Sequence, residues 1–168
     1  MTVADLQRAY DYGYWANAKL FAVVGGLTPE QYTQTVAGSY GSIRNTLVHV
    51  MSAEWGWLDR CGGFPRGPAL KADDYPTFES LVTAWRSVET HVREFLSGLS
   101  DADLDRIVQF TLPGSAPQSI PLGALMQHAA NHAVHHRGQV ALLLRLLGHT
   151  PGNFDLVIYD GELRSTVA

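Results

Sequence analysis

Residues 122–147 constrain the fold more than any other stretch of this sequence. They read LGALMQHAANHAVHHRGQVALLLRLL and contain four of the chain's seven histidines. Because each residue of an α-helix turns by about 100°, the apolar side chains of this stretch gather into one stripe. The stripe consists of Leu122, Leu125, Met126, Ala129, Ala133, Val140, Leu143, Leu144 and Leu147. We therefore predict a long amphipathic helix whose stripe faces a protein core.

The four histidines of this helix are not equivalent. His136 lies roughly 20° from the middle of the stripe and His132 roughly 60° from it, whereas His128 and His135 lie on the flank, roughly 100° and 120° away. The inward pair is spaced i, i+4, which places the two Cβ atoms about 6 Å apart on one helix face. Both imidazoles can then reach a single metal ion.

Two explanations of the inward pair stay open. His132 and His136 can be core residues that hydrogen-bond to neighbouring helices, or ligands of a divalent metal. A neutral imidazole keeps one donor and one acceptor, and leaving either unpaired in a core costs about 1–3 kcal/mol. Two such rings one turn apart favour the metal. For His128 and His135 we expect a supporting contact, a dimer contact or solvent.

Composition limits the class of protein. With 168 residues, 46% of them hydrophobic, the chain is long enough for one core, and we predict a single domain over residues 1–168. It has no apolar targeting segment and no run of about 18 apolar residues, so we expect a soluble, cytoplasmic protein without a membrane partner. A net charge of −4 with dispersed basic residues argues against nucleic acid. The single cysteine, Cys61, excludes an internal disulfide, and we expect a packed, inert thiol there.

Three further helices are predicted from apolar periodicity and end signals. They cover residues 3–24, before a Gly-Gly pair, 43–60, after Ser42, and 78–96, after Thr77. Residues 107–112 and 118–121 flank a Pro-Gly-Ser turn and predict a small hairpin. The apolar tail, residues 153–159, should pack back on the helices. Together these elements predict an all-α four-helix bundle with a small β-hairpin before the last helix.

The second predicted helix carries two residues of interest. His49 projects roughly 140° from the centre of its apolar stripe, so spacing alone predicts a surface residue. Apolar residues cover much of this helix, including Val48 and Trp55, so a second buried face is the alternative. Glu54 lies on the inward stripe, where a carboxylate is costly unless an arginine, a ligand histidine or a metal accompanies it.

The string Asn131-His132-Ala133-Val134-His135-His136-Arg137-Gly138-Gln139 resembles the NHxxHHRGQ signature of the DinB-like family of bacterial four-helix bundles. Trp15-Ala16-Asn17 and Leu47-Val48-His49-Val50 support the resemblance. It implies a metal-dependent enzyme whose divalent ion is held by His49, His132 and His136; for His49 this stands against the periodicity. It further implies a cytoplasmic homodimer and a small-molecule substrate, with low-molecular-weight thiols used by some relatives.

Three neutral imidazoles leave a metal ion its full charge and an open position, as in catalytic zinc sites. We expect zinc or nickel, with manganese or iron as alternatives. Glu54 or Asp155 could act as a base or orient a ligand, and Arg137 could bind a substrate carboxylate or pair with a neighbouring helix. The leading hypothesis is a metal-dependent thiol S-transferase or hydrolase. The alternatives are a non-catalytic metal-binding or stress-response protein and a purely structural bundle.

Overall fold

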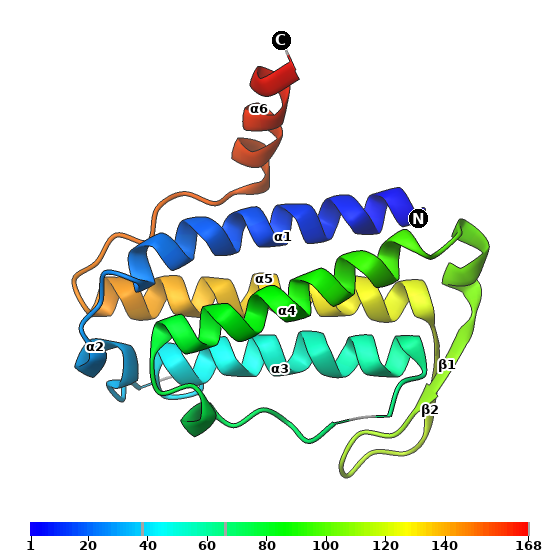
Figure 1. Cartoon of the computed structure of the whole chain (residues 1–168), viewed down its shortest axis with the longest axis horizontal. Coiled ribbons are helices and arrows are strands. Elements are labelled where there is room, and N and C mark those ends of the chain that lie inside the picture. The colour runs from blue at the N-terminus through cyan, green and yellow to red at the C-terminus, as the bar shows by residue number, and fades with distance from the viewer. Residues whose placement is uncertain (38, 66, 168) are drawn as a thin grey trace.

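The computed structural model describes residues 1–37, 39–65 and 67–167, and four long helices dominate it (Figure 1). They are α1 (Val3–Val24), α3 (Ile43–Gly62), α4 (Phe78–Ser97) and α5 (Leu122–Leu146). The shorter elements are α2 (Pro29–Thr33), η1 (Ala72–Asp74), η2 (Asp101–Asp105), the strands β1 (Ile107–Phe110) and β2 (Gln118–Pro121), and α6 (Leu156–Val167). The predicted all-α bundle with a hairpin before its last long helix is confirmed.

Capping side chains set where the long helices begin. Thr2, Ser42 and Thr77 each accept a hydrogen bond from the backbone N–H three residues later, which satisfies one of the free donors of the first turn. At the other end of α3, Gly63 adopts a left-handed conformation with φ of 71°, which favours glycine. These local signals explain why the predicted bounds agree with the structure to within two residues.

The core lies between the four long helices. α3 packs along α5 and α4, and α1 packs along the same two helices. Large side chains that are almost completely buried fill the space, among them Leu6, Leu20, Ile43, Leu47, Met51, Leu81, Leu96, Leu122, Met126 and Leu144. Each such side chain stabilises the fold by about 1.5–3 kcal/mol relative to exposure. In the described part of the chain, no helix has the length and apolarity needed to cross a bilayer.

The hairpin closes one end of the bundle. β1 and β2 pair antiparallel, with Val108 opposite Ile120. The Val108 side chain is buried, and Phe110 contacts Trp57 of α3 edge to face at 5.3 Å between ring centroids. The hairpin therefore fixes the start of α5 against the end of α3.

The chain after α5 differs from the prediction. It forms the helix α6, which projects from the bundle beyond α1 (Figure 1). Only part of the apolar tail packs back: Tyr159 is buried against Tyr12 and Trp15, whereas Leu156 and Val157 are exposed. The expectation of a packed tail was wrong for these residues, because helical periodicity turns them away from α1.

Candidate metal centre

Three histidines from two helices converge at the α3–α5 interface. His49 comes from α3, and His132 and His136 come from successive turns of α5. One ring nitrogen from each lies within 4.8 Å of the other two. The Nε2 atom of His132 lies 3.0 Å from Nε2 of His49 and 3.0 Å from Nε2 of His136. Among the described residues this is the group of three side chains with the spacing of metal ligands.

The spacing and the protonation of these rings suit a divalent ion. Nitrogens bound tetrahedrally to one zinc ion at about 2.0–2.1 Å lie about 3.3 Å apart, close to the separation seen here. His136 is buried and the other two are half-buried. Desolvation, and then the neighbouring imidazoles, lower the pKa of His49 and of His132 to about 4. The rings are therefore neutral near pH 7, as ligands must be.

Gln139 fixes the orientation of His136. Its Oε1 atom lies 2.6 Å from Nδ1 of His136 and accepts a hydrogen bond from it. With the proton on Nδ1, the lone pair of His136 is on Nε2, which faces the other two rings. Ser39 donates to the same Oε1 atom, and the Gln139 amide nitrogen lies 3.1 Å from Nε2 of His135. Such a supporting layer is typical of metal-binding histidines.

Hydrogen bonds among the three rings cannot satisfy them all. Because His136 carries its proton on Nδ1, its Nε2 atom is an acceptor. A single N–H on His132 makes one well-aligned bond, although its Nε2 atom has two neighbours at 3.0 Å. At least one of the two short contacts is then not a well-aligned hydrogen bond, whichever nitrogen of His132 carries the proton. A cation that accepts all three lone pairs removes this conflict, so the donor set fits a metal.

The loop before α3 covers the cluster. Tyr40 stacks on His49 with 3.9 Å between ring centroids and an interplanar angle of 20°, and it meets His136 edge to face. Ser39, beside it, has a φ of 49°, which a residue with a side chain rarely adopts. Neither residue was identified from the sequence, because a loop has no regular repeat from which the direction of a side chain can be predicted.

The two flank histidines of α5 lie beside the cluster. Both are exposed. The His128 ring contacts Trp57 and lies 6.1 Å from His132, while His135 contacts His136 and Gln139. Their exposed positions beside the cluster fit two of the three expected alternatives, a supporting contact and contact with solvent.

The carboxylates considered as a base or a ligand partner lie elsewhere. Glu54 is buried, and its two oxygens accept from Tyr14 Oη and Trp85 Nε1. Desolvation raises the pKa of Glu54. Asp155 is exposed at the start of α6. In the described part of the chain, neither carboxylate joins the histidine group.

Arg137 links two helices rather than facing the cluster. It is buried, and its Nη1 atom donates to Asn17 Oδ1 at 3.2 Å and to the Gly13 carbonyl. Its guanidinium also lies over the Tyr12 ring. These contacts agree with a helix-to-helix role, made through hydrogen bonds instead of the expected ion pair. Cys61 is completely buried, and burial raises the pKa of its thiol to about 11, as expected for an inert cysteine.

The surface position that periodicity predicts for His49 was wrong. α3 is covered on several sides by α5, α4, α2 and the hairpin, so it has no single apolar stripe. Thr46, on the same flank as His49, is completely buried. A helix in this position places its flank inside the bundle, as the alternative of a second buried face allowed and the single-stripe calculation did not.

A model of the DinB family matches residues 1–162. The chain belongs to the DinB family. It is 24% identical over 159 residues to the protein named DinB of Bacillus subtilis (strain 168), an alignment that covers 90% of this chain and 91% of the relative. The resemblance inferred from the sequence motifs is thereby confirmed.

Solved structures agree with the fold. The crystal structure of a DinB-like protein from Bacillus cereus ATCC 10987 matches with a TM-score of 0.72 and 24% identity, over 90% of this chain and 97% of that one. A DinB-like protein from Bacillus subtilis matches with a TM-score of 0.61 and 16% identity, over 86% and 94%. At these identities the likeness concerns the fold alone.

Proposed function

We propose that this DinB family protein binds one divalent transition-metal ion through His49, His132 and His136 and is a metal-dependent enzyme that acts on small molecules. The observation that carries the proposal is the convergence of the three Nε2 atoms, with His136 held by Gln139 in the tautomer that a ligand needs. Three imidazoles favour zinc or nickel over manganese or iron, because nitrogen ligands suit the later metals better.

A bound ion of this kind supplies Lewis-acid chemistry, lowering the pKa of water on zinc to about 7, or stabilising a thiolate. The protein's own residues supply orientation and cover. Gln139 holds His136, and the Tyr40 ring shields one side of His49. Among the described carboxylates none joins the cluster, and Glu54 is occupied by Tyr14 and Trp85. This arrangement favours a thiol S-transferase over a hydrolase that depends on a carboxylate base, because a thiolate held by the ion would need no such base.

Metal analysis of the purified full-length protein tests the site. After loading with zinc or nickel and desalting, we expect one ion per chain in the wild type and loss of the ion in His132→Ala. His91→Ala is the matched control, because His91 is an exposed histidine of α4 outside the cluster. Retention of the ion by His132→Ala, or its absence from the loaded wild type, would contradict the proposal.

Turnover separates an enzyme from a non-catalytic metal-binding or stress-response protein. A panel of small electrophiles is incubated with low-molecular-weight thiols and the loaded protein, and thiol consumption is followed. We expect a rate that chelation abolishes and that His132→Ala lacks. A background rate that the chelator leaves unchanged would support the non-catalytic alternative.

A further inference from the structure

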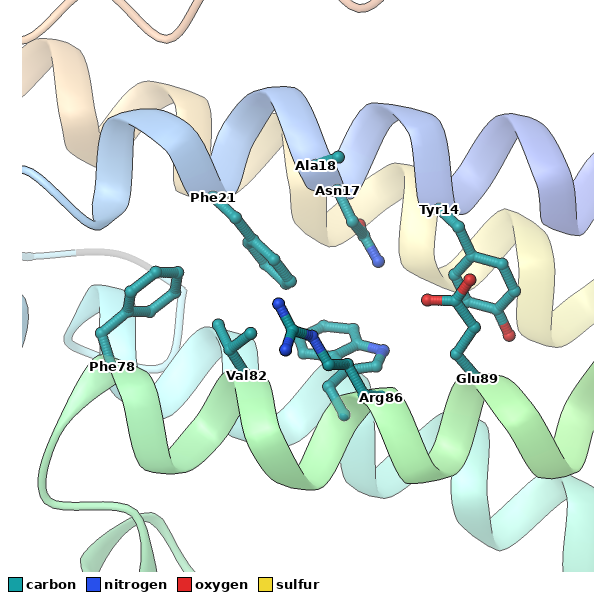
Figure 2. Close-up of a pocket in the computed structure, with 9 residues that line it drawn as sticks. Tyr14, Asn17, Ala18, Phe21, Phe78, Val82, Arg86 and Glu89 are labelled. Atoms are coloured by element: carbon teal, nitrogen blue, oxygen red, sulfur yellow. The ribbon is translucent and has the colours of Figure 1, made fainter.

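A second site lies on the opposite side of the bundle from the histidine cluster. A pocket of about 320 Å³ separates α1 and α4, whereas the cluster lies between α3 and α5. Its apolar walls are Phe21, Phe78 and Val82 (Figure 2), together with Trp85. Phe21 meets Phe78 and Trp85 edge to face, at 5.5 Å and 5.2 Å between centroids. Ala18 and Arg86 are exposed, so the pocket opens to solvent.

Several polar groups around the pocket already have partners. The Tyr14 hydroxyl and the Trp85 indole N–H both donate to Glu54 in the core. The carboxylate of Glu89 accepts from Arg93 Nε at 3.0 Å, which offsets its negative charge. These groups hold the walls in place and are not free to bind a ligand.

The groups that remain are hydrogen-bond donors. Asn17 is 6% exposed, and its Oδ1 atom accepts from Arg137, so its NH₂ group lies on the other side of the amide. Figure 2 shows the Asn17 amide from α1 and the Arg86 guanidinium from α4 both directed into the pocket. Within residues 1–37, 39–65 and 67–167, the Asn17 NH₂ group and the Arg86 guanidinium make no hydrogen bond or ion pair. An amide NH₂ group that faces an open pocket and has no partner in the protein can donate to a ligand that accepts hydrogen bonds.

We propose that this α1–α4 pocket binds a small monocarboxylate with a flat apolar body. A planar carboxylate matches the fork of N–H groups on the Arg86 guanidinium, and the Asn17 NH₂ group offers a further donor to it. The apolar body lies against Phe21, Phe78 and Trp85, whose ring edges and faces suit an aromatic ligand. The volume is near the lower end for ligand pockets, which limits the body to one or two rings.

Charge placement sets the orientation of the ligand. Figure 2 shows Glu89 toward the Tyr14 end of the pocket, whereas the Arg86 guanidinium lies toward Phe21. A carboxylate at the Arg86 end avoids Glu89, and a neutral analogue loses the charged contact. The site thus discriminates an acid from its amide.

Calorimetric titration of the full-length protein tests the site. Benzoate, naphthalene-2-carboxylate and indole-3-acetate are the probes, and naphthalene-2-carboxamide is the neutral analogue. We expect saturable binding of at least one acid with one site per chain, and roughly tenfold weaker binding of the amide than of naphthalene-2-carboxylate. The Arg86→Met variant should weaken the binding of the acid by a similar factor. Arg164→Met, which removes an exposed arginine of α6, should leave it unchanged.

Two further measurements locate the binding. Ala18→Trp fills the mouth of the pocket from an exposed position and should abolish binding, which provides a second variant that leaves the core untouched. His132→Ala and chelator-treated protein should bind the acid as the loaded wild type does, so the result is independent of the proposed metal function. Binding that requires the metal, survives both Arg86→Met and Ala18→Trp, or fails for all three acids overturns the proposal.

Discussion

Gln139 shows how a single residue can decide whether a histidine is a ligand. Its Oε1 atom accepts hydrogen bonds from the Nδ1–H group of His136 and from the Ser39 hydroxyl, while its NH₂ group faces His135. Without this acceptor the His136 ring is free to change tautomer and to rotate about its side-chain bonds. The lone pair on Nε2 would then face the cluster only part of the time.

Gln139→Leu should weaken metal binding while the fold persists. The variant keeps a side chain of similar size but removes the acceptor for His136 Nδ1, and losses of supporting contacts typically cost about 10- to 100-fold in metal affinity. Competition with a chelator of known affinity measures the effect. Gln139→Glu keeps an acceptor oxygen and should retain most of the affinity. Equal affinity of Gln139→Leu and the wild type would contradict the assigned role.

Residue spacing predicted part of this centre. The i, i+4 pair and its apolar surroundings identified His132 and His136, because both lie on one helix. Gln139, three residues after His136, is within reach on the same helix and could have been proposed from that spacing. Tyr40 could not, because its position depends on how a loop folds over another element.

At the scale of elements, a buried polar network ties three helices together. Glu54 of α3 accepts from Tyr14 of α1 and from Trp85 of α4. Arg137 of α5 lies near enough to lower the pKa of Glu54, against the larger effect of desolvation. The network therefore fixes the relative positions of the helices and, in particular, the walls of the α1–α4 pocket.

Glu54→Ala should destabilise the protein without removing its metal. The substitution leaves the Tyr14 hydroxyl and the Trp85 N–H buried without an acceptor, which should lower the free energy of unfolding by about 3 kcal/mol. Urea denaturation measures the change, and Glu94→Ala at an exposed site of α4 is the control. Glu54→Gln keeps one acceptor oxygen and should lose less. Lower metal affinity at unchanged stability would instead link Glu54 to the histidine cluster.

The bounds of elements were more predictable than their surroundings. Threonine and serine caps and the glycines after helices are local, so the long helices could be placed from the sequence. Which side of α3 is buried depends on four neighbouring elements, and His49 was misplaced for that reason. The helix α6 was not predicted, because its apolar residues do not form one stripe: Tyr159 packs on α1, whereas Leu156 and Val157 are exposed.

At the scale of the whole molecule, α5 has an exposed apolar face that belongs neither to the core nor to the histidine cluster. Val134, Leu142 and Leu146 are 44%, 56% and 60% exposed and fall within about 120° around the helix. Gly138 lies between them, and, apart from its chain neighbours and the nearby backbone of its own helix, no atom of the described chain lies within 4 Å of where its Cβ would be. A glycine inside a helix costs about 1 kcal/mol relative to alanine, and no packing within the described chain requires this one.

We propose that this face forms the interface of the homodimer that the family resemblance implies. Exposed apolar side chains around a glycine allow the α5 helices of two copies to approach closely, which buries surface that would otherwise favour aggregation.

Sedimentation velocity at micromolar concentrations should show a dimer for the wild type. Replacing Leu142 and Leu146 together by glutamate should weaken association roughly 100-fold, because the charges would be buried in the interface. Ile107→Glu, on the exposed side of the hairpin, is the matched control and should leave the dimer intact. A monomeric wild type, or a dimer that tolerates both glutamates, would exclude this face as the interface.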